Sequence, residues 1–428
     1  MDYIPVSVEA EIHADPVEVT AKLRRWNRLY EDGWRAADAH LHFDRIEPAA
    51  DRDWFAMMQG DDIAHSQFMT LKGGMVPGVW AEQFAFGDQG EAVADGSTIV
   101  SGEEYRDRLQ GHILLFGLGE LIQPITTGGP DSPNTFPALA TVLNRARKTG
   151  GLVGAAHGGT LGVSPTVLVD AILGEAEFTE IANWGWTFWP LTNWYRLMNC
   201  GFNLPPTAGT DLPNNPRREP WQPFLGGMRM YAKTGDLTGA EPWNRAVRTG
   251  ATFVTSGPII ELSAEGAGPG ETVCLSPNGG QVGVSARLRS PRGLSRIEIV
   301  QNGRAVSKSI EIRREGGVQS IALETSLRFE KSGWIAARGE GERGGVFGGN
   351  AVAHTAAIRV LVGGAPIWSE SDGQALVDQI EEQKAFYAEN GRYATQGDRR
   401  QVLALFDRAI GELRAKHEGG GKSDVCAQ

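Results

Sequence analysis

The chain has 428 residues, of which 41% are hydrophobic and 22% charged, and its formal net charge at pH 7 is −11. This length predicts about two or three domains, and the composition is that of a globular protein with a large core. The negative charge and the lack of a basic stripe argue against nucleic acid as a partner, because clustered Lys and Arg side chains supply the affinity for phosphate backbones.

The chain also lacks the usual signals for export or membrane insertion. Its first residues do not form the charged and apolar regions of a signal peptide, and no run approaches the ~18 apolar residues of a membrane span. The three cysteines, Cys200, Cys274 and Cys426, are widely spaced and odd in number, which matches neither a zinc knuckle nor a disulfide framework. We therefore expect reduced thiols, no membrane partner and a cytoplasmic location, with an N-terminally trimmed form of an exported precursor as the alternative.

The first half of the chain reads as an α/β domain. Residues 1–33 alternate apolar and polar positions, and we expect an N-terminal β segment that packs on the domain at 34–257. In that domain, short apolar runs alternate with helix-like segments such as "FPALATVLNRARKTG" and "SPTVLVDAILGEA". Strands that alternate with helices of about 10–15 residues indicate βα units in a parallel sheet or barrel.

The second half changes its periodicity twice. Residues 258–364 alternate with period two between Gly- and Pro-rich turns, which predicts a small β-sandwich. Residues 365–418 contain two amphipathic helices with apolar positions at i, i+3 and i+4. We expect the Gly-rich tail, 419–428, to be disordered.

Polar side chains recur where the strands of the α/β domain should end. Ligands collect at the carboxyl ends of parallel strands, so these residues are candidates for a common site. They are His40, His42, Glu103, Glu104, His112, His157, Glu180 and Asp211.

The motif "ADAHLHF" holds His40 and His42 two positions apart. Residues i and i+2 of a strand project from the same face, so the two imidazoles can share one metal ion. The alternative is one histidine satisfied in the core beside an exposed one. Asp38 either orients an imidazole from behind or is a surface acid.

The later motifs are each ambiguous alone. The Glu103–Glu104 pair is a carboxylate site or a solvated turn, and His157 in "GAAHGG" is a ligand with small neighbours or an incidental part of a glycine turn. Asp211 in "AGTDLP" is a ligand, a helix cap or an Asx-turn. Their order on consecutive strand ends is what predicts a shared site.

That order, HxH, then GxE, GH, AH and GTD, resembles the PHP (polymerase and histidinol phosphatase) metallohydrolase superfamily. The segments "GWRAADAHLH", "GEEYRDRLQGHILLFGL", "AAHGG", "CGFNLPPTAGTD" and "AVRTGATFVTSGPIIEL" look like its CehA/McbA branch, named for carbaryl hydrolases, over roughly residues 20–275. The resemblance implies a distorted (β/α)7 barrel with metals at its mouth, followed here by the β-sandwich and the C-terminal helices.

The resemblance also implies a set of metal ligands. One ion is surrounded by His40, His42, Glu104 and Asp211, and Glu104 bridges to a second ion. The second ion is held by His112 and His157.

Two details of the motifs refine this set. Glu104 is preferred to Glu103 because the family places its bridging glutamate two residues after a glycine, here Gly102. Pro213 stands where a third metal site would have a histidine, so we expect two ions. His65, in "DDIAH", is a further ligand or substrate contact to consider.

This ligand set suits two divalent ions, with zinc as the first choice and manganese or iron as alternatives. We expect a metal-bridging hydroxide to cleave an ester, carbamate or amide-like bond of a small molecule. The catalytic residues would be Glu104, His157 and Asp211, with His65 or Tyr231 as general acid. The alternatives are a phosphoesterase at the same site and an inactive relative that binds a carbohydrate or another ligand.

Substrate contacts are expected from side chains near the mouth. Trp184 and Trp186, in "NWGWTFWPLTNWYR", either stack on a planar group of the substrate or belong to the core. Arg196 and Arg229 either bind an anionic group or lie on the surface. Besides the small-molecule substrate, a second copy of the chain is an open alternative as partner.

Overall fold

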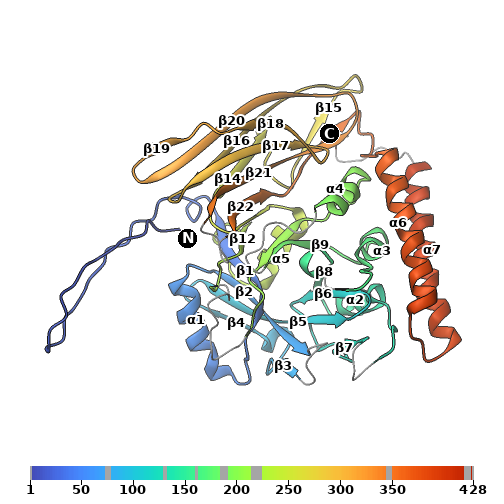
Figure 1. Cartoon of the computed structure of the whole chain (residues 1–428), viewed down its shortest axis with the longest axis horizontal. Helices are drawn as coiled ribbons and strands as arrows, with labels where there is room; N and C mark the ends of the chain where they lie inside the picture. Colours follow the sequence, from blue (N-terminus) through green and yellow to red (C-terminus); the bar gives the residue numbers. More distant parts are fainter. Residues whose placement is uncertain are drawn as a thin grey trace.

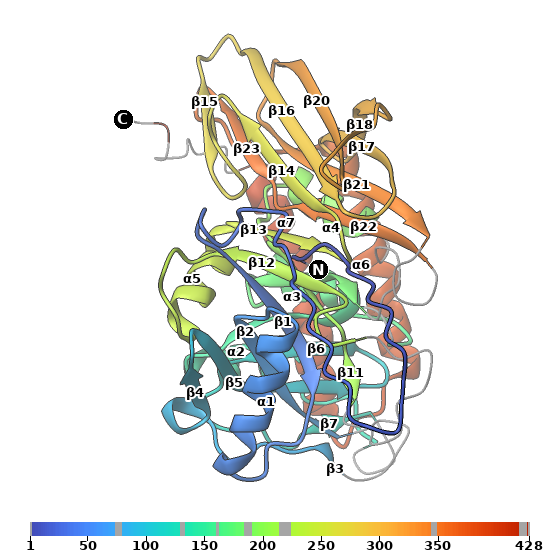
Figure 2. The ribbon, with the colours of Figure 1, turned by 90° about the vertical axis from the view of Figure 1, so that its left-hand side faces the viewer.

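The computed structural model describes residues 2–72, 79–128, 133–159, 162–183, 191–213, 224–343, 349–418 and Cys426. The architecture is mixed α/β, with one large sheet, a separate four-stranded sheet and helices along the flank (Figure 1). The first half of the chain forms the lower part of the molecule in Figure 2, and a β-rich module lies above it.

The lower part is built on a mixed sheet. Its strands are β1 (Trp34–His42), β2 (His65–Lys72), β3 (Val79–Ala81), β4 (Glu91–Ala94), β5 (Ser97–Asp107), β6 (Gly111–Phe116), β7 (Thr126–Thr127), β8 (Leu152–Ala155), β9 (Phe178–Asn183) and β10 (Pro206–Gly209). The pairs β1–β2, β2–β5, β8–β9 and β9–β10 are parallel. In contrast, β6 is antiparallel to both β5 and β8. The turn from Asp107 to Gly111 explains this departure from a parallel sheet, because a parallel connection needs about a dozen residues or more.

The segment that follows β10, the last of these strands, lies beside β1, the first. The backbone N–H of Asp211 donates to the carbonyl of His40 at 2.8 Å. A Cβ atom at Gly209 would lie 2.4 Å from the backbone nitrogen of His40, so this approach requires glycine. The strand β11 (Leu212–Pro213) then pairs in parallel with the last residues of β1. The chain segment that carries Asp211 therefore lies against the end of β1.

Short helices cover this sheet: α1 (Asp51–Gly60), α2 (Leu139–Lys148), α3 (Val167–Ile172), α4 (Thr192–Asn199) and α5 (Ala240–Thr249). In α2, the residues Leu139, Val142, Leu143 and Ala146 are buried, which is the spacing of one helix face. Basic residues fill its last turn, where they complement the negative end of the helix dipole.

The large sheet continues without a break into the β-rich module. The strand β12 (Arg229–Lys233) is antiparallel to β1, and β13 (Thr252–Thr255) is antiparallel to β12. On its other side β13 pairs with β22 (Asn350–Thr355), a strand of the upper module. The two parts of the chain are thus joined by backbone hydrogen bonds as well as by side-chain packing.

The upper module has two layers of strands. Its remaining strands are β14 (Ile259–Ala264), β15 (Thr272–Leu275), β16 (Gly280–Ser290), β17 (Leu294–Gln301), β18 (Arg304–Ser309), β19 (Arg313–Glu315), β20 (Val318–Phe329), β21 (Gly333–Arg343) and β23 (Ile358–Val362). The separate sheet has the order β14-β16-β20-β19. Along β16, Val282, Val284, Ala286 and Leu288 are buried and alternate with exposed residues, as the period-two pattern predicts. They share a core with residues of β17 and β21, such as Ile297 and Ile335.

Two long helices, α6 (Glu370–Asn390) and α7 (Gln396–Glu418), lie side by side along the flank, next to α3 and α4 (Figure 1). The hydroxyl of Ser369 caps α6 by accepting from the backbone N–H of Asp372. Gln383 and Tyr387 of α6 donate to the carbonyls of Pro165 and Ser164. These contacts tie the C-terminal helices to the loop before α3.

The N-terminal residues form an extended arm that projects from the body (Figure 1). Its base is a bridge between Tyr3 and Arg25, and Ile12 near its tip is 90% exposed. The carboxylate of Asp2 is buried and accepts hydrogen bonds from Asn27 and Tyr231. The arm is therefore anchored at its base.

The cysteines differ from expectation. Cys274 of β15 forms a disulfide with Cys426, 152 residues further along the chain, while Cys200 is free and buried. The expectation of reduced thiols is therefore wrong for two of the three cysteines. Wide spacing in sequence did not prevent the pairing, because the fold places Cys426 beside Cys274 of β15. In the part of the chain that the structure describes, no helix has the length and apolarity needed to cross a membrane.

Candidate metal centre

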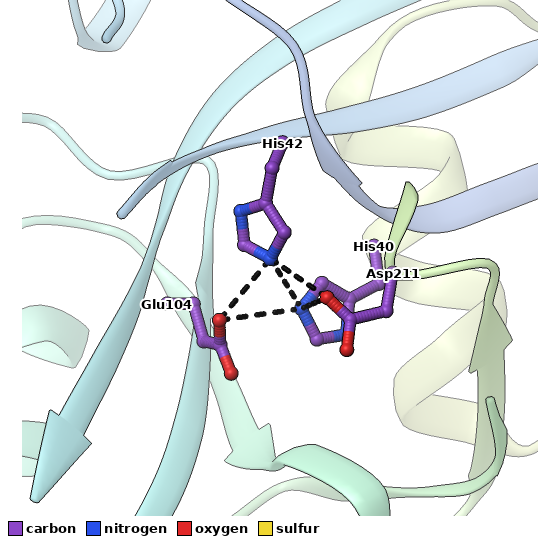
Figure 3. Close-up of side chains that lie close together, drawn as sticks. All are labelled: His40, His42, Glu104 and Asp211. Atoms are coloured by element: carbon purple, nitrogen blue, oxygen red, sulfur yellow. Dashed lines mark hydrogen bonds and ion pairs between the residues drawn. The ribbon is translucent and has the colours of Figure 1, made fainter. Parts of the chain in front are cut away.

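The centre starts from the two histidines at the end of β1. His40 and His42 project from the same face, and their Nε2 atoms are 3.1 Å apart (Figure 3). Both side chains are buried. The Nδ1–H of His42 donates to the carbonyl of Met69 at 3.4 Å, which leaves Nε2 with a lone pair directed at the centre.

Two carboxylates complete a first group of four ligand atoms (Figure 3). An oxygen of Asp211 lies 2.9 Å from Nε2 of His42 and 3.5 Å from Nε2 of His40. An oxygen of Glu104 lies 3.1 and 3.7 Å from the same two nitrogens. Ligands of one tetrahedral zinc ion, bound at about 2.0–2.2 Å, are roughly 3.3 Å from one another. The four side chains are therefore spaced to hold one ion.

A second group shares Glu104 with the first. Its Oε2 faces His40 and His42, whereas Oε1 lies 3.0 Å from Nδ1 of His112 and 3.4 Å from Nε2 of His157. Glu104, His112 and His157 could hold an ion of their own. A carboxylate with one oxygen toward each group is placed to bridge two ions.

The strand geometry separates Glu104 from its neighbour. Successive residues of β5 point to opposite faces, and Glu103 points away from the centre. One of its oxygens accepts from the backbone N–H of Ile122 at 2.9 Å. The sequence preference for Glu104 over Glu103 thus agrees with the side of the strand on which each carboxylate lies.

Two of the candidate ligands have strained backbone conformations. His157, in the short 3-10 segment Ala156–Gly159, has φ 44° and ψ 41°, and Asp211 has φ 52°. Non-glycine residues in this left-handed region cost on the order of 1–3 kcal/mol each. The surrounding hydrogen bonds must hold these conformations, which aim both side chains at the centre.

Glu180 and Asn183 support the centre from behind. The sequence motifs assign no role to Glu180. Its Oε1 lies 3.1 Å from Nδ1 of His40, and its Oε2 accepts from the backbone N–H of His157 at 2.9 Å and from Nδ2 of Asn183 at 3.0 Å. A carboxylate on the outer nitrogen of a ligating histidine fixes its tautomer and orientation. The sequence signal was "FTEIAN", which forms β9, with Glu180 in the middle of the strand and Asn183 at its end.

Asp38 is neither a surface acid nor a partner of an imidazole ring. It is buried, and one oxygen accepts from the backbone N–H of Thr210 at 2.9 Å. The other accepts from the Thr210 hydroxyl at 2.7 Å and from the backbone N–H of Gly226 at 2.8 Å. Burial raises the pKa of Asp38 to about 6. Its role is to fix the loop that presents Asp211.

The centre has more negative than positive charge. Burial by itself would lower the pKa of His40, but Glu180 and Asp211 outweigh burial and raise it well above its ordinary value. Burial by itself would raise the pKa of Asp211, but His40 and His42 lower it to about 2. The site therefore favours any positive charge placed among these groups, and a divalent cation supplies it.

Arg106 contacts Glu104, and the sequence motifs did not suggest this contact. It follows Glu104 by two residues on β5 and therefore projects from the same face. Its Nε and Nη2 donate to one oxygen of Glu104 at 2.9 and 2.8 Å. A fixed cation thus lies directly beside the candidate bridging carboxylate.

His65 lies outside the centre. It is at the beginning of β2, its ring stacks on Trp243 with centroids 4.3 Å apart, and its Nε2 is 2.9 Å from Nε2 of Gln67. Burial lowers its pKa to about 3. Of the candidate metal-ligand groups within the described ranges, none includes His65. His65 pairs with Ala37 of β1 and Thr98 of β5, at the opposite end of these strands from the candidate ligands, so its place in the sheet is structural.

The candidate substrate contacts are also placed elsewhere. Arg229 is buried and donates to the carbonyl of Gly226, and Tyr231 donates to Asp2. Arg196 lines a separate cleft of about 600 Å³ between α4 and the start of α6. Trp184 and Trp186 lie outside the described residues.

No protein-family model matches the sequence, and no curated protein does either. Three solved structures are similar over 50% of this chain. The first is the lesion-specific endonuclease PfuEndoQ from Pyrococcus furiosus, with 14% sequence identity, 56% of its chain covered and a TM-score of 0.32. The second is PsfC from Pseudomonas syringae PB-5123, with 14% identity, 90% of its chain covered and a TM-score of 0.33. The third is endonuclease Q in complex with a 27-mer duplex substrate with an abasic lesion, with 16% identity, 56% of its chain covered and a TM-score of 0.33. The match spans little more than half of either endonuclease chain.

These neighbours correct one expectation. Two of them are endonucleases, one solved with a duplex substrate, so the exclusion of nucleic acid as a partner is wrong. The exclusion relied on net charge, which is a sum over the whole chain. It says nothing about local charge, and Arg106 is a cation at the centre itself.

Proposed function

We propose that this chain is a metal-dependent hydrolase of the PHP superfamily, in its CehA/McbA branch. The observation that carries the proposal is the position of Glu104, whose two oxygens face two separate groups of histidines. The return of β10 to the side of β1 supports a distorted (β/α)7 barrel at 34–257. The upper module at 258–364, which is joined to it by the pairing of β13 with β22, and the helices at 365–418 are proposed as the further units of the chain.

The residues present fit two divalent ions. Four imidazoles and two carboxylates form a donor set of nitrogen and oxygen atoms that suits zinc, with manganese or iron as alternatives. His40, His42, Glu104 and Asp211 would hold one ion, and Glu104, His112 and His157 the other. When bound, such ions supply a water of lowered pKa and polarise the bond to be cleaved.

The chain's own residues prepare this chemistry. Glu180 orients His40, and Asp38 fixes the loop that carries Asp211. Burial of the ligands keeps bulk water away from them, which strengthens each electrostatic contact. The substrate bond is proposed to be an ester, carbamate or amide-like bond of a small molecule. A phosphoester is a second candidate, favoured by Arg106 at the centre.

The test is a substrate panel with protein loaded with Zn²⁺ or Mn²⁺. The panel contains p-nitrophenyl acetate, an aryl carbamate, p-nitrophenyl phosphate, bis-p-nitrophenyl phosphate and a duplex with an abasic site. We expect metal-dependent turnover of at least one compound, abolished in Glu104→Gln. Protein that binds metal but cleaves none of them would instead favour an inactive ligand-binding relative. A homo-oligomer and a cytoplasmic location stay predictions.

A further inference from the structure

The side of the centre that meets solvent is defined by three side chains. His40, Glu104 and His157 are fully buried. By contrast, the side chain of Arg106 is 17% exposed, that of His112 12% and that of Asp211 10%. Among the described side chains of the centre, these three therefore face the side from which a substrate can approach, and Arg106 is the most exposed of them.

Arg106 is held in place by the strands around it. It lies directly opposite His112 in the antiparallel pair of β5 and β6, so both side chains share one face. Its own carbonyl accepts from the hydroxyl of Thr126 at 2.6 Å. The guanidinium is thus presented from a rigid strand rather than from a loop, which is how specific contacts are usually positioned.

Arg106 has more hydrogen-bond donors than its contact with Glu104 uses. A guanidinium has five N–H donors, and Arg106 directs only Nε and Nη2 at one oxygen of Glu104. Among the described residues, no hydrogen-bond or ion-pair partner is found for its Nη1. Because a guanidinium stays protonated in proteins, the group is a permanent cation, and it has donors that its contact with Glu104 does not use.

A role for Arg106 that is limited to holding Glu104 in place would explain only part of this geometry. Both oxygens of Glu104 already face imidazoles, so Arg106 is not needed to satisfy the carboxylate. With two ions bound as proposed above, their charge offsets that of Glu104. The charge of Arg106 is then available to a third group, and its planar fork matches a carboxylate or a phosphate.

We propose that Arg106 is a specificity-determining residue that binds an oxyanion of the substrate beside the metal ligands, so that anionic substrates are preferred over neutral ones. This inference rests on the proposed function. The oxyanion belongs either to the scissile group, as in a phosphoester, or to a carboxylate elsewhere on an ester. Two matched pairs separate these sources: p-nitrophenyl phosphate against p-nitrophenyl acetate, and mono-p-nitrophenyl glutarate against p-nitrophenyl valerate.

The variants are Arg106→Gln, which removes the charge, and Arg106→Lys, which keeps the charge but lacks the planar N–H donors of the guanidinium group. Arg108→Gln is the matched control, because Arg108 is exposed and two residues further along. Metal-loaded protein is titrated calorimetrically with inorganic phosphate, kcat/KM is measured for both pairs, and metal content and thermal melting are recorded for each variant.

We expect Arg106→Gln to keep its metal and to weaken phosphate binding on the order of 10- to 100-fold. The ratio of kcat/KM for the anionic over the neutral member of one pair should fall by a similar factor. Arg106→Lys should recover part of the loss, and Arg108→Gln should behave as wild type.

Three results would overturn the proposal: wild-type protein that binds no phosphate, equal losses for anionic and neutral substrates, or loss of metal in both Arg106 variants. The last would make Arg106 a positioning residue for Glu104. If wild-type protein binds metal and cleaves no compound, the proposed function fails, yet the phosphate titration still decides whether Arg106 binds an oxyanion.

Discussion

Oε1 of Glu180 lies 3.1 Å from Nδ1 of His40, a residue 140 positions earlier in the chain. The other oxygen of Glu180 accepts from the backbone N–H of His157. One buried carboxylate thus orients a residue of each candidate ligand group. A substitution of Glu180 therefore tests directly whether the two candidate ligand groups act as a unit.

We expect Glu180→Gln to weaken metal binding about 10- to 100-fold, because an outer carboxylate fixes the tautomer and raises the basicity of a ligating histidine. Competition with a chromophoric chelator measures this affinity. Glu177→Gln is the matched control, since Glu177 pairs with Arg248 away from the centre. Unchanged metal affinity in Glu180→Gln would show that His40 is not a ligand that depends on this contact.

The adjacent glutamates of β5 offer a second test. Glu104→Gln should lose at least one of the two ions, since an amide cannot bridge them with two anionic oxygens. Glu103→Gln should keep both ions, because burial raises the pKa of Glu103 and its side chain lies on the other face. Metal analysis of the two dialysed variants decides this. Equal metal loss in both would contradict the assignment of the bridge.

His65 predicts a pH dependence of stability that is independent of metal binding. Burial lowers its pKa to about 3 in the folded state, whereas an unfolded histidine titrates near ~6.5. Between these values the unfolded state binds more protons, so the stability contribution is complete above pH 6.5 and is lost as pH falls. At pH 5 the loss is about 2 kcal/mol.

Urea unfolding of wild type and His65→Phe at pH 7.5 and pH 5 measures this contribution. The phenyl ring can still stack on Trp243 but does not titrate, so the variant should lose about 2 kcal/mol less between the two pH values. His13→Gln, on the exposed arm, should follow wild type. Identical pH dependence in wild type and His65→Phe would contradict the burial of a neutral His65.

The sequence pattern was most informative where side-chain periodicity is local. The alternation along β16 and the two amphipathic C-terminal helices appear where their periods indicated them. The antiparallel β6, the pairing of β13 with β22 and the Cys274–Cys426 disulfide were not foreseen. Each depends on which distant segments meet, and periodicity carries no information about that.

The residues of the candidate metal centre likewise divide into those that the sequence predicted and those whose role only the fold revealed. The six residues that the family resemblance implied as ligands do lie together, because the segments that carry them meet at one edge of the sheet. Arg106, Glu180 and Asn183 gained their roles only from distances measured in the fold. His65 has a suitable residue type but lies at the beginning of its strand, where it packs on a tryptophan.

The most direct test of the account is the metal content of the purified chain after loading with Zn²⁺ or Mn²⁺ and dialysis, measured by plasma mass spectrometry beside His40→Ala. The account predicts about two divalent ions per chain in wild type and loss of metal in the folded variant. A wild-type chain that retains no metal, or a His40→Ala variant that retains as much as wild type, would contradict it.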